Sequence, residues 1–137
     1  MRGTICLFSA SGIVLVALVA CSGPSMPDRF DGRAFFSDNC TSCHGQGGAG
    51  DGDMAKGLPI APTDLTTLSR TNGGTFPATR ALAYIWGDPE ESHLARVMPQ
   101  FGGAMAEDLV PVRLEGVFTP TPRALAGLLA YLESIQQ

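Results

Sequence analysis

The 137-residue sequence has no run of basic residues. Lysine and arginine together number nine against thirteen aspartates and glutamates, which gives a formal charge of −4 at neutral pH. These charges are spread thinly along the chain, and nucleic-acid-binding segments instead concentrate positive charge. The composition therefore argues against nucleic acid as a partner.

Histidine is also scarce, since the chain has only two. A structural zinc site needs four nitrogen or sulfur ligands. Apart from Cys6 and Cys21 near the N-terminus, the whole supply of such ligands is Cys40, Cys43, His44 and His93. Zinc therefore stays open only as an alternative that uses every one of them.

No apolar run of the sequence is long enough to span a bilayer comfortably. Residues 13–20 are continuously apolar and follow a weakly positive start at Arg2. That length is typical of a signal-peptide core, whereas a membrane-spanning helix needs about 20 apolar residues. We interpret residues 1–20 as a cleaved leader, with an N-terminal anchor helix as the alternative.

The chain does contain a C-x-x-C-H motif, at Cys40–His44. This spacing is the attachment signature of a c-type haem. Both thiols must reach two vinyl groups on one edge of the same porphyrin, so one short turn has to carry them. The histidine that follows can ligate the iron as a neutral imidazole. The motif predicts one haem c, bound covalently through Cys40 and Cys43, with His44 on the iron.

A C-x-x-C pair can instead be a thiol–disulfide redox site at the start of a helix. That interpretation expects a βαβ context. Residues 45–50 after the motif are glycine-rich and typical of a loop. The dithiol therefore remains, like zinc, a less favoured alternative.

An electron-shuttling haem usually has a second protein ligand on its iron. The chain downstream of the leader offers Met26, Met54, Met98, Met105 and His93. Met98 is favoured because it lies in a loop punctuated by glycine and proline, where Pro99 restricts the backbone. A core position is the alternative role for Met98, and His93 is expected on the solvated surface. A thioether ligand stabilises reduced iron and raises its potential.

A first helix is predicted to run through residues 32–39 into the motif, with Asp28 or Asp31 as its cap. Gly32 and Phe36 lie four residues apart and share one face of this helix. Glycine weakens a helix, so its presence predicts that another helix approaches closely at Gly32.

Further elements are predicted downstream from periodicity and capping signals. They are a helix over 80–86 capped by Thr79, a short helix over 104–110 capped near Met105, and a last helix over 123–135 capped by Thr121. The apolar stripe of the last helix comprises Leu125, Leu128, Leu129, Leu132 and Ile135. Residues 45–75 read as a long loop that a non-protein group must support, and residues 110–118 as an extended excursion or small hairpin.

The end of the leader, Leu18–Cys21, resembles the lipobox of bacterial lipoproteins. The resemblance implies that residues 1–20 are a signal peptide, that Cys21 carries the lipid, and that residues 21–28 form a tether. Cys6 would then be removed with the leader, which leaves no unassigned thiol and suits an oxidising compartment. We expect a lipid-anchored protein on the periplasmic side of a bacterial membrane.

Residues 29–137 resemble the class I c-type cytochromes. The resemblance is carried by the motif at 40–44, by Met98–Phe101 as the distal-methionine motif, and by helix-contact positions. Those positions are Gly32, Phe36, Leu128, Tyr131 and Leu132. It implies an all-α cytochrome c fold, with about four short helices around one haem and with the first and last helices crossing. It also implies an electron carrier, not an enzyme, whose partners are redox proteins.

The family's proximal histidine donates its other ring proton to a carbonyl of a proline segment, which implies that Pro59 or Pro62 lies near His44. The chain departs from the family at residues 106–120, which separate the methionine loop from the last helix. We expect this excursion to cover the haem edge or a docking face. The alternative functions are a haem subunit of a larger oxidoreductase and a haem-based sensor.

Overall fold

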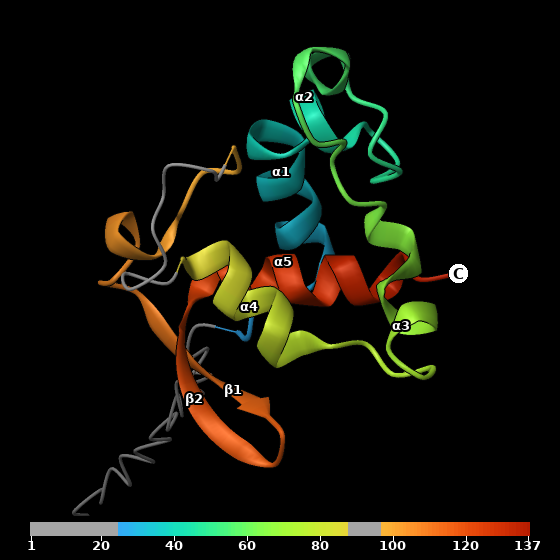
Figure 1. The fold of residues 1–137 in the computed structure, drawn as a ribbon. Helices are drawn as coiled ribbons and strands as arrows, with labels where there is room; N and C mark the ends of the chain where they lie inside the picture. Colours follow the sequence, from blue (N-terminus) through green and yellow to red (C-terminus); the bar gives the residue numbers. More distant parts are fainter. Residues whose placement is uncertain (1–24, 88–96) are drawn as a thin grey trace, which may run out of the picture.

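The computed structural model describes residues 25–87 and 97–137. It shows a mostly helical domain in which α1 (Arg29–Asn39) lies across α5 (Arg123–Ser134) (Figure 1). The remaining helical elements are α2 (Thr41–His44), η1 (Asp53–Gly57), η2 (Leu65–Thr67), α3 (Leu68–Thr71), α4 (Ala78–Trp86) and η4 (Gly102–Ala104). The strands β1 (Leu109–Leu114) and β2 (Val117–Pro122) form a small antiparallel sheet. The predicted fold class is confirmed.

Within these two ranges, every helix is too short or too polar to cross a bilayer. The leader, Cys21 and His93 lie outside the described residues.

Asp28 begins α1 with a reciprocal capping arrangement. Its carboxylate accepts from the backbone amides of Phe30 at 2.7 Å and Asp31 at 3.2 Å. The Asp31 carboxylate accepts from the Asp28 amide at 2.9 Å. Both ends of the first turn are thereby satisfied. Of the two predicted caps, Asp28 takes the position, and Asp31 completes the box.

The crossing of α1 and α5 depends on glycine at two facing positions. A Cβ atom built on Gly32 would lie 1.9 Å from the carbonyl oxygen of Gly127, which is far inside van der Waals contact. The two backbones therefore touch, as the sequence predicted for Gly32. One turn along α1, Phe36 is buried, and its ring centroid lies 5.1 Å from that of Tyr131 on α5.

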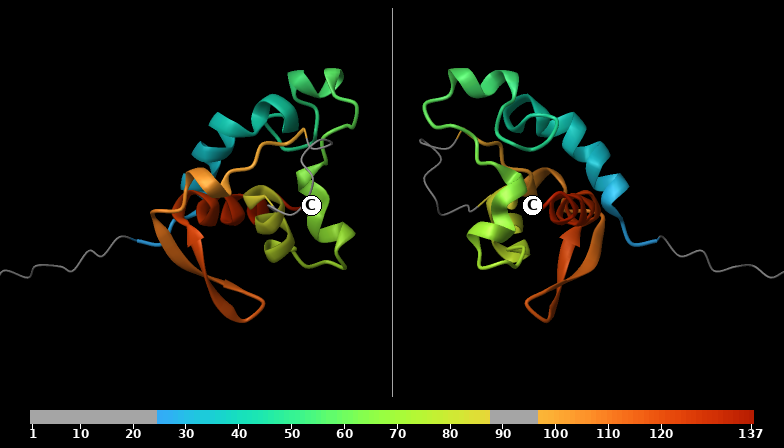
Figure 2. Two further views of the ribbon diagram at one scale, coloured as in Figure 1. Left: turned by 60° about the vertical axis from the view of Figure 1, so that its left-hand side comes forward. Right: turned by 90° about the vertical axis from the view of Figure 1, so that its right-hand side faces the viewer.

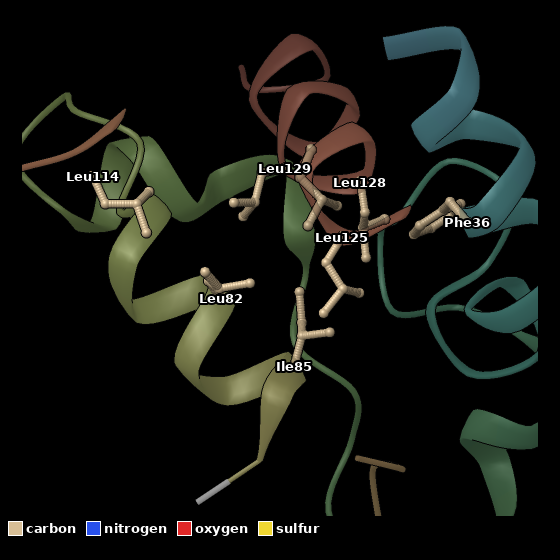
Figure 3. Close-up of a cluster of buried hydrophobic side chains, with 8 residues drawn as sticks. Phe36, Leu82, Ile85, Leu114, Leu125, Leu128 and Leu129 are labelled. Carbon is tan, nitrogen blue, oxygen red and sulfur yellow. The ribbon is translucent and has the colours of Figure 1, made fainter. Parts of the chain in front are cut away.

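The hydrophobic core lies between α5, α4, the end of α1 and the hairpin (Figure 3). The predicted stripe of α5 supplies half of its buried members, and Ile135 is only partly buried. Its buried members are Phe36, Leu82, Ile85, Leu114, Leu125, Leu128, Leu129 and Leu132. Because side chains from every longer element meet here, the core ties the two chain ends to the middle of the sequence.

Two predicted helix caps are wrong. The helix α4 starts at Ala78 after Pro77, so Thr79 lies inside its first turn. The helix α5 starts directly after Pro122, because Thr121 is the partner of Val110 in the sheet. The buried Thr121 hydroxyl donates to the Thr119 carbonyl at 3.0 Å instead of capping the helix.

The predicted helix over 104–110 is also wrong. The 3₁₀ turn η4 ends at Ala104, and the strand β1 begins at Leu109. Pairing with β2 overrides the weak local helix signal, because it buries Val110 and Leu114 against the core. The extended excursion at 110–118 is confirmed as a hairpin, which extends over 109–122. The predicted loop over 45–75 contains the short helices η1, η2 and α3.

We predict that Gly32→Ala destabilises the folded protein. The helix preference of alanine favours the change by up to about 1 kcal/mol, but the new methyl group overlaps the Gly127 carbonyl. Forcing the helices apart should lower the free energy of unfolding by about 2 kcal/mol or more. Thermal unfolding of the haem-loaded protein measures this loss of stability.

The matched control is Gly47→Ala, since no atom lies within 4 Å of a Cβ at that position. An unchanged melting temperature for Gly32→Ala would contradict the close approach of α1 and α5.

Candidate haem site

A single tight turn brings the C-x-x-C-H side chains together. Cys40 ends α1, where its amide donates to the Phe36 carbonyl at 2.9 Å, and also begins α2. The His44 amide donates back to the Cys40 carbonyl at 2.9 Å. Both cysteines are free thiols and partly buried. The motif therefore sits directly after a helix that the core holds in place.

The glycine-rich loop after the motif supports this turn from behind. The amides of Gly50 and Gly52 donate to the carbonyls of His44 at 2.8 Å and Cys43 at 3.1 Å. A Cβ on Gly50, whose φ is +82°, would lie 2.4 Å from the Pro62 carbonyl oxygen. Glycine at position 50 thus lets the proline segment approach the back of the haem turn.

The imidazole of His44 is oriented by the carbonyl of Thr63. Nδ1 lies 3.0 Å from this oxygen, which can only accept, so Nδ1 carries the proton. The second nitrogen, Nε2, then has its lone pair available for a metal ion. The sequence analysis expected the contact near Pro59 or Pro62. The acceptor is neither proline itself but the residue directly after Pro62.

Burial keeps this imidazole neutral. His44 is 9 % exposed, and burial lowers the pKa of its side chain, while the bond to Thr63 opposes the shift only in part. A lowered pKa leaves the ring uncharged at neutral pH, which is the form that binds iron.

The segment that carries Thr63 is held by the C-terminus. The side chain of Gln136 donates from Nε2 to the Leu65 carbonyl at 2.7 Å and accepts at Oε1 from the Ser69 amide at 2.8 Å. The Gln137 amide donates to the Thr66 carbonyl at 2.9 Å. The sequence analysis missed these residues, because only the fold brings positions so far apart together.

Asp64 stiffens the same segment locally. Its carboxylate accepts from the hydroxyl of Thr66 at 2.6 Å and from the Thr66 amide at 2.9 Å. These two bonds, with the hydroxyl contributing most, lower the pKa of the Asp64 carboxyl. An aspartate followed two residues later by threonine is a local turn signal that sequence inspection could have found.

The turn opens onto two adjoining cavities of about 340 Å³ and about 170 Å³. Cys40, His44 and Met98 line both, and Cys43 lines the smaller one. The larger one is otherwise mainly apolar, with Phe36, Ile85, Leu128 and Leu132 among its walls. The structure therefore brings all four predicted haem-site residues to one place.

Met98 is positioned through Phe101. The Phe101 amide donates to the Ile85 carbonyl on α4 at 3.1 Å. Its ring packs edge-on against that of Phe35 on α1, with centroids 5.6 Å apart. The methionine loop is thereby fixed to two helices. Met26, Met54 and Met105 line neither cavity.

Two residues of α4 that the sequence analysis did not single out also line the larger cavity. Arg80 and Tyr84 lie one helical turn apart and face the same space. Their four-residue spacing on a predicted helix was the available signal.

The alternative chemistries do not match this geometry. Burial, and then the neighbouring Cys43, raise the pKa of the Cys40 thiol to about 11. A redox dithiol needs a thiol whose pKa is lowered, because the thiolate is the nucleophile. Among the described residues, no three histidine, cysteine or acidic side chains gather where they could hold a metal ion.

The residues present fit a haem. The cavities are bounded by paired thiols on one turn, a buried neutral imidazole with a free nitrogen and a methionine. Apolar walls suit a macrocycle, which would fill the space between α4, α5 and the haem turn.

We predict that the Asp64 carboxylate makes folding stability depend on pH below neutrality. Because folding lowers its pKa, its stabilisation is complete above the unfolded value of about 3.9. That stabilisation is lost as the pH falls through the lower folded value. Thermal unfolding of the haem-loaded protein from pH 7 to pH 3 should show that Asp64→Asn lowers the melting temperature most at pH 7.

The difference in melting temperature between Asp64→Asn and the unmodified protein should shrink toward pH 3. Asp38→Asn, on the exposed face of α1, serves as the control. A pH-independent difference would show that the carboxylate charge is not what matters.

Comparison with known protein families agrees with this site. The family model described as cytochrome c matches residues 31–136. Searches among curated proteins and among solved structures found no match. The matched region includes most of α1, the haem turn, the methionine loop and α5. The chain therefore belongs to the cytochrome c family, and Cys40 and Cys43 attach a covalent haem c.

Proposed function

We propose that this chain is a membrane-tethered, periplasmic electron carrier with His44 and Met98 as axial ligands. Membership of the cytochrome c family implies electron transfer by the haem and the existence of redox partner proteins. The observation that supports the ligand pair is that both side chains line the same two cavities. With both axial positions filled by the protein, the domain passes electrons without catalysing a reaction of its own.

The choice of Met98 as the distal ligand is supported by its surroundings. It is partly buried and packs against the hydrophobic core. Met54 is 58 % exposed, and Met105 lies beyond η4, outside both cavities. His93, the other nitrogen ligand that the sequence offers, lies outside the described residues.

When bound, the haem supplies a one-electron iron couple, whose potential a thioether ligand shifts upward. The residues of the chain set its environment. The Thr63 carbonyl accepts a hydrogen bond from His44 Nδ1, which maintains the basicity of Nε2. Apolar walls exclude water, and Arg80 is the charged residue in the lining, suited to offset acidic haem substituents.

We predict that Met98→Ala abolishes the iron–methionine charge-transfer band of the oxidised protein. Loss of the thioether removes its preference for reduced iron, so the reduction potential should fall. The opened iron should also bind carbon monoxide in the reduced state at neutral pH. The oxidised spectrum shows the charge-transfer band, and the reduced spectrum under carbon monoxide shows ligand binding. A redox titration followed by visible spectroscopy gives the reduction potential.

Met54→Ala is the control, because Met54 is exposed and lines neither cavity. If Met98→Ala keeps the charge-transfer band, the assignment of Met98 is wrong. If the unmodified reduced protein binds carbon monoxide without denaturation, it is a ligand-binding haem protein and not a closed carrier.

We predict that the double variant Cys40→Ala/Cys43→Ala, which cannot attach haem, is largely unfolded. The cavity lies against core side chains such as Leu128 and Leu132, so an unfilled cavity removes packing partners from the core itself. Thermal unfolding followed by circular dichroism should show no cooperative transition. Ser42→Ala, an exposed position in the same turn, should keep the haem and the transition.

The tether and its location are supported by the sequence alone. In this proposal, residues 1–20 are the signal peptide, Cys21 carries the lipid, residues 21–28 are the tether, and residues 29–137 form the haem domain. The lipobox-like Leu18–Cys21 supports export. So does the thiol count, because after cleavage only Cys40 and Cys43 remain besides the lipidated Cys21.

A further inference from the structure

The hairpin that separates this chain from its family pattern has two different faces. Directly paired residues share a face, and Val110, Leu114 and Thr121 bury one face against the core. On the opposite face, Pro122 is buried at the base of the hairpin. The rest of that face, called here the outer hairpin face, consists of Leu109, Pro111, Arg113, Phe118 and Pro120. All five are exposed.

The outer hairpin face is apolar apart from one cation. Phe118 is 61 % exposed, and the guanidinium of Arg113 lies over its ring, 4.3 Å from the centroid. An exposed group of apolar side chains on a small domain indicates a contact surface. An aromatic ring beside an arginine suits the surface of a lipid bilayer, whose interior is apolar and whose headgroups carry phosphate.

Prolines prevent this hairpin from recruiting another strand. Pro111 faces Pro120, and neither has an amide hydrogen, so their pair cannot be hydrogen-bonded. By alternation, the backbone groups of the pairs Leu109–Pro122 and Arg113–Phe118 also point outward. Since position 122 is a third proline, only Leu109, Arg113 and Phe118 offer an outward amide. An edge with so few donors is a poor template for strand addition. The hairpin is therefore better suited to contacts through the side chains of its outer face.

The base of the hairpin holds the point where the chain enters the domain. Arg123 donates from Nη1 to the Ser25 carbonyl at 2.7 Å and from Nε to the Asp108 carboxylate at 2.9 Å. Asp108 directly precedes β1. Cys21 lies four residues before Ser25, so an extended chain between them spans at most about 14 Å. A lipid on Cys21 would place the membrane close to the hairpin.

The hairpin lies away from the haem turn. In both views of Figure 2, it extends from the side of α5 opposite to α2. No residue of 109–122 lines either haem cavity. The expectation that this excursion covers the haem edge is therefore wrong, and contact with the outer hairpin face leaves the cavities open.

We propose that the outer hairpin face rests on the lipid bilayer beside the Cys21 anchor and turns the haem cavity away from the membrane. Phe118 and Leu109 enter the interface, and Arg113 faces lipid phosphate. This inference rests on the proposed lipidation of Cys21. Because the acyl chains already hold the protein, the hairpin determines its orientation more than its affinity.

The test is photocrosslinking of the full, haem-loaded and lipidated protein in phosphatidylcholine–phosphatidylglycerol vesicles. Phe118→benzoylphenylalanine places the probe on the outer hairpin face with little change of shape. Ile60→benzoylphenylalanine is the matched control, because Ile60 is 71 % exposed and lines the smaller haem cavity. We expect a phospholipid adduct at position 118, severalfold above that at position 60. Leu109→benzoylphenylalanine should repeat the result if the first variant fails to fold.

Mass analysis of the N-terminus separates the two proposals. Lipid on Cys21 with equal or absent adducts at 118 and 60 would overturn the orientation and leave the anchor standing. A crosslink from 118 to a second protein chain would overturn it in favour of a protein contact. An unlipidated Cys21 would overturn both. Loss of the 118 adduct in Cys21→Ser would support the dependence on the tether.

Discussion

The hydrogen bond between His44 Nδ1 and the Thr63 carbonyl joins two parts of the chain that have little regular structure of their own. One is the haem turn with its glycine loop, and the other is the proline segment that follows. Without this bond, the imidazole could rotate, and either ring nitrogen could face the cavity. With it, the proton position and the ring plane are both defined. The remaining contacts of the site serve to keep these two segments at that separation.

Those contacts lead to the chain ends. The proline segment continues into η2 and α3, which the C-terminal Gln136 and Gln137 hold through backbone groups. The haem turn follows directly from α1, which is packed on α5 through Gly32 and Gly127. Since those glutamines follow closely after the end of α5, one helix supports both sides of the histidine. A change in how α1 and α5 cross would therefore reach the His44 imidazole.

Two exposed apolar regions lie on different sides of the domain. One surrounds the haem cavities, where Ile60, Tyr84 and Val97 are exposed near Met98. The other is the outer hairpin face, on the far side of α5 (Figure 2). Electron transfer requires the first to remain accessible to a partner. The second lies next to the point where the chain enters the domain, which suits the proposed contact with a membrane.

The sequence by itself determined the cofactor, because the spacing in Cys40–His44 is a covalent requirement of the haem and needs no knowledge of the fold. It also predicted that another helix approaches closely at Gly32, and the family resemblance identified that helix as the last one. Only the tertiary structure decided which carbonyl meets His44, because the acceptor at Thr63 depends on how Gly50 lets the proline segment approach. It likewise decided that Thr121 does not cap α5, because the pairing of Thr121 with Val110 outweighed the local preference of threonine to begin a helix. Local signals are reliable where covalent chemistry or steric exclusion fixes the residue type, and they fail where strand pairing competes with a helix for the same residue.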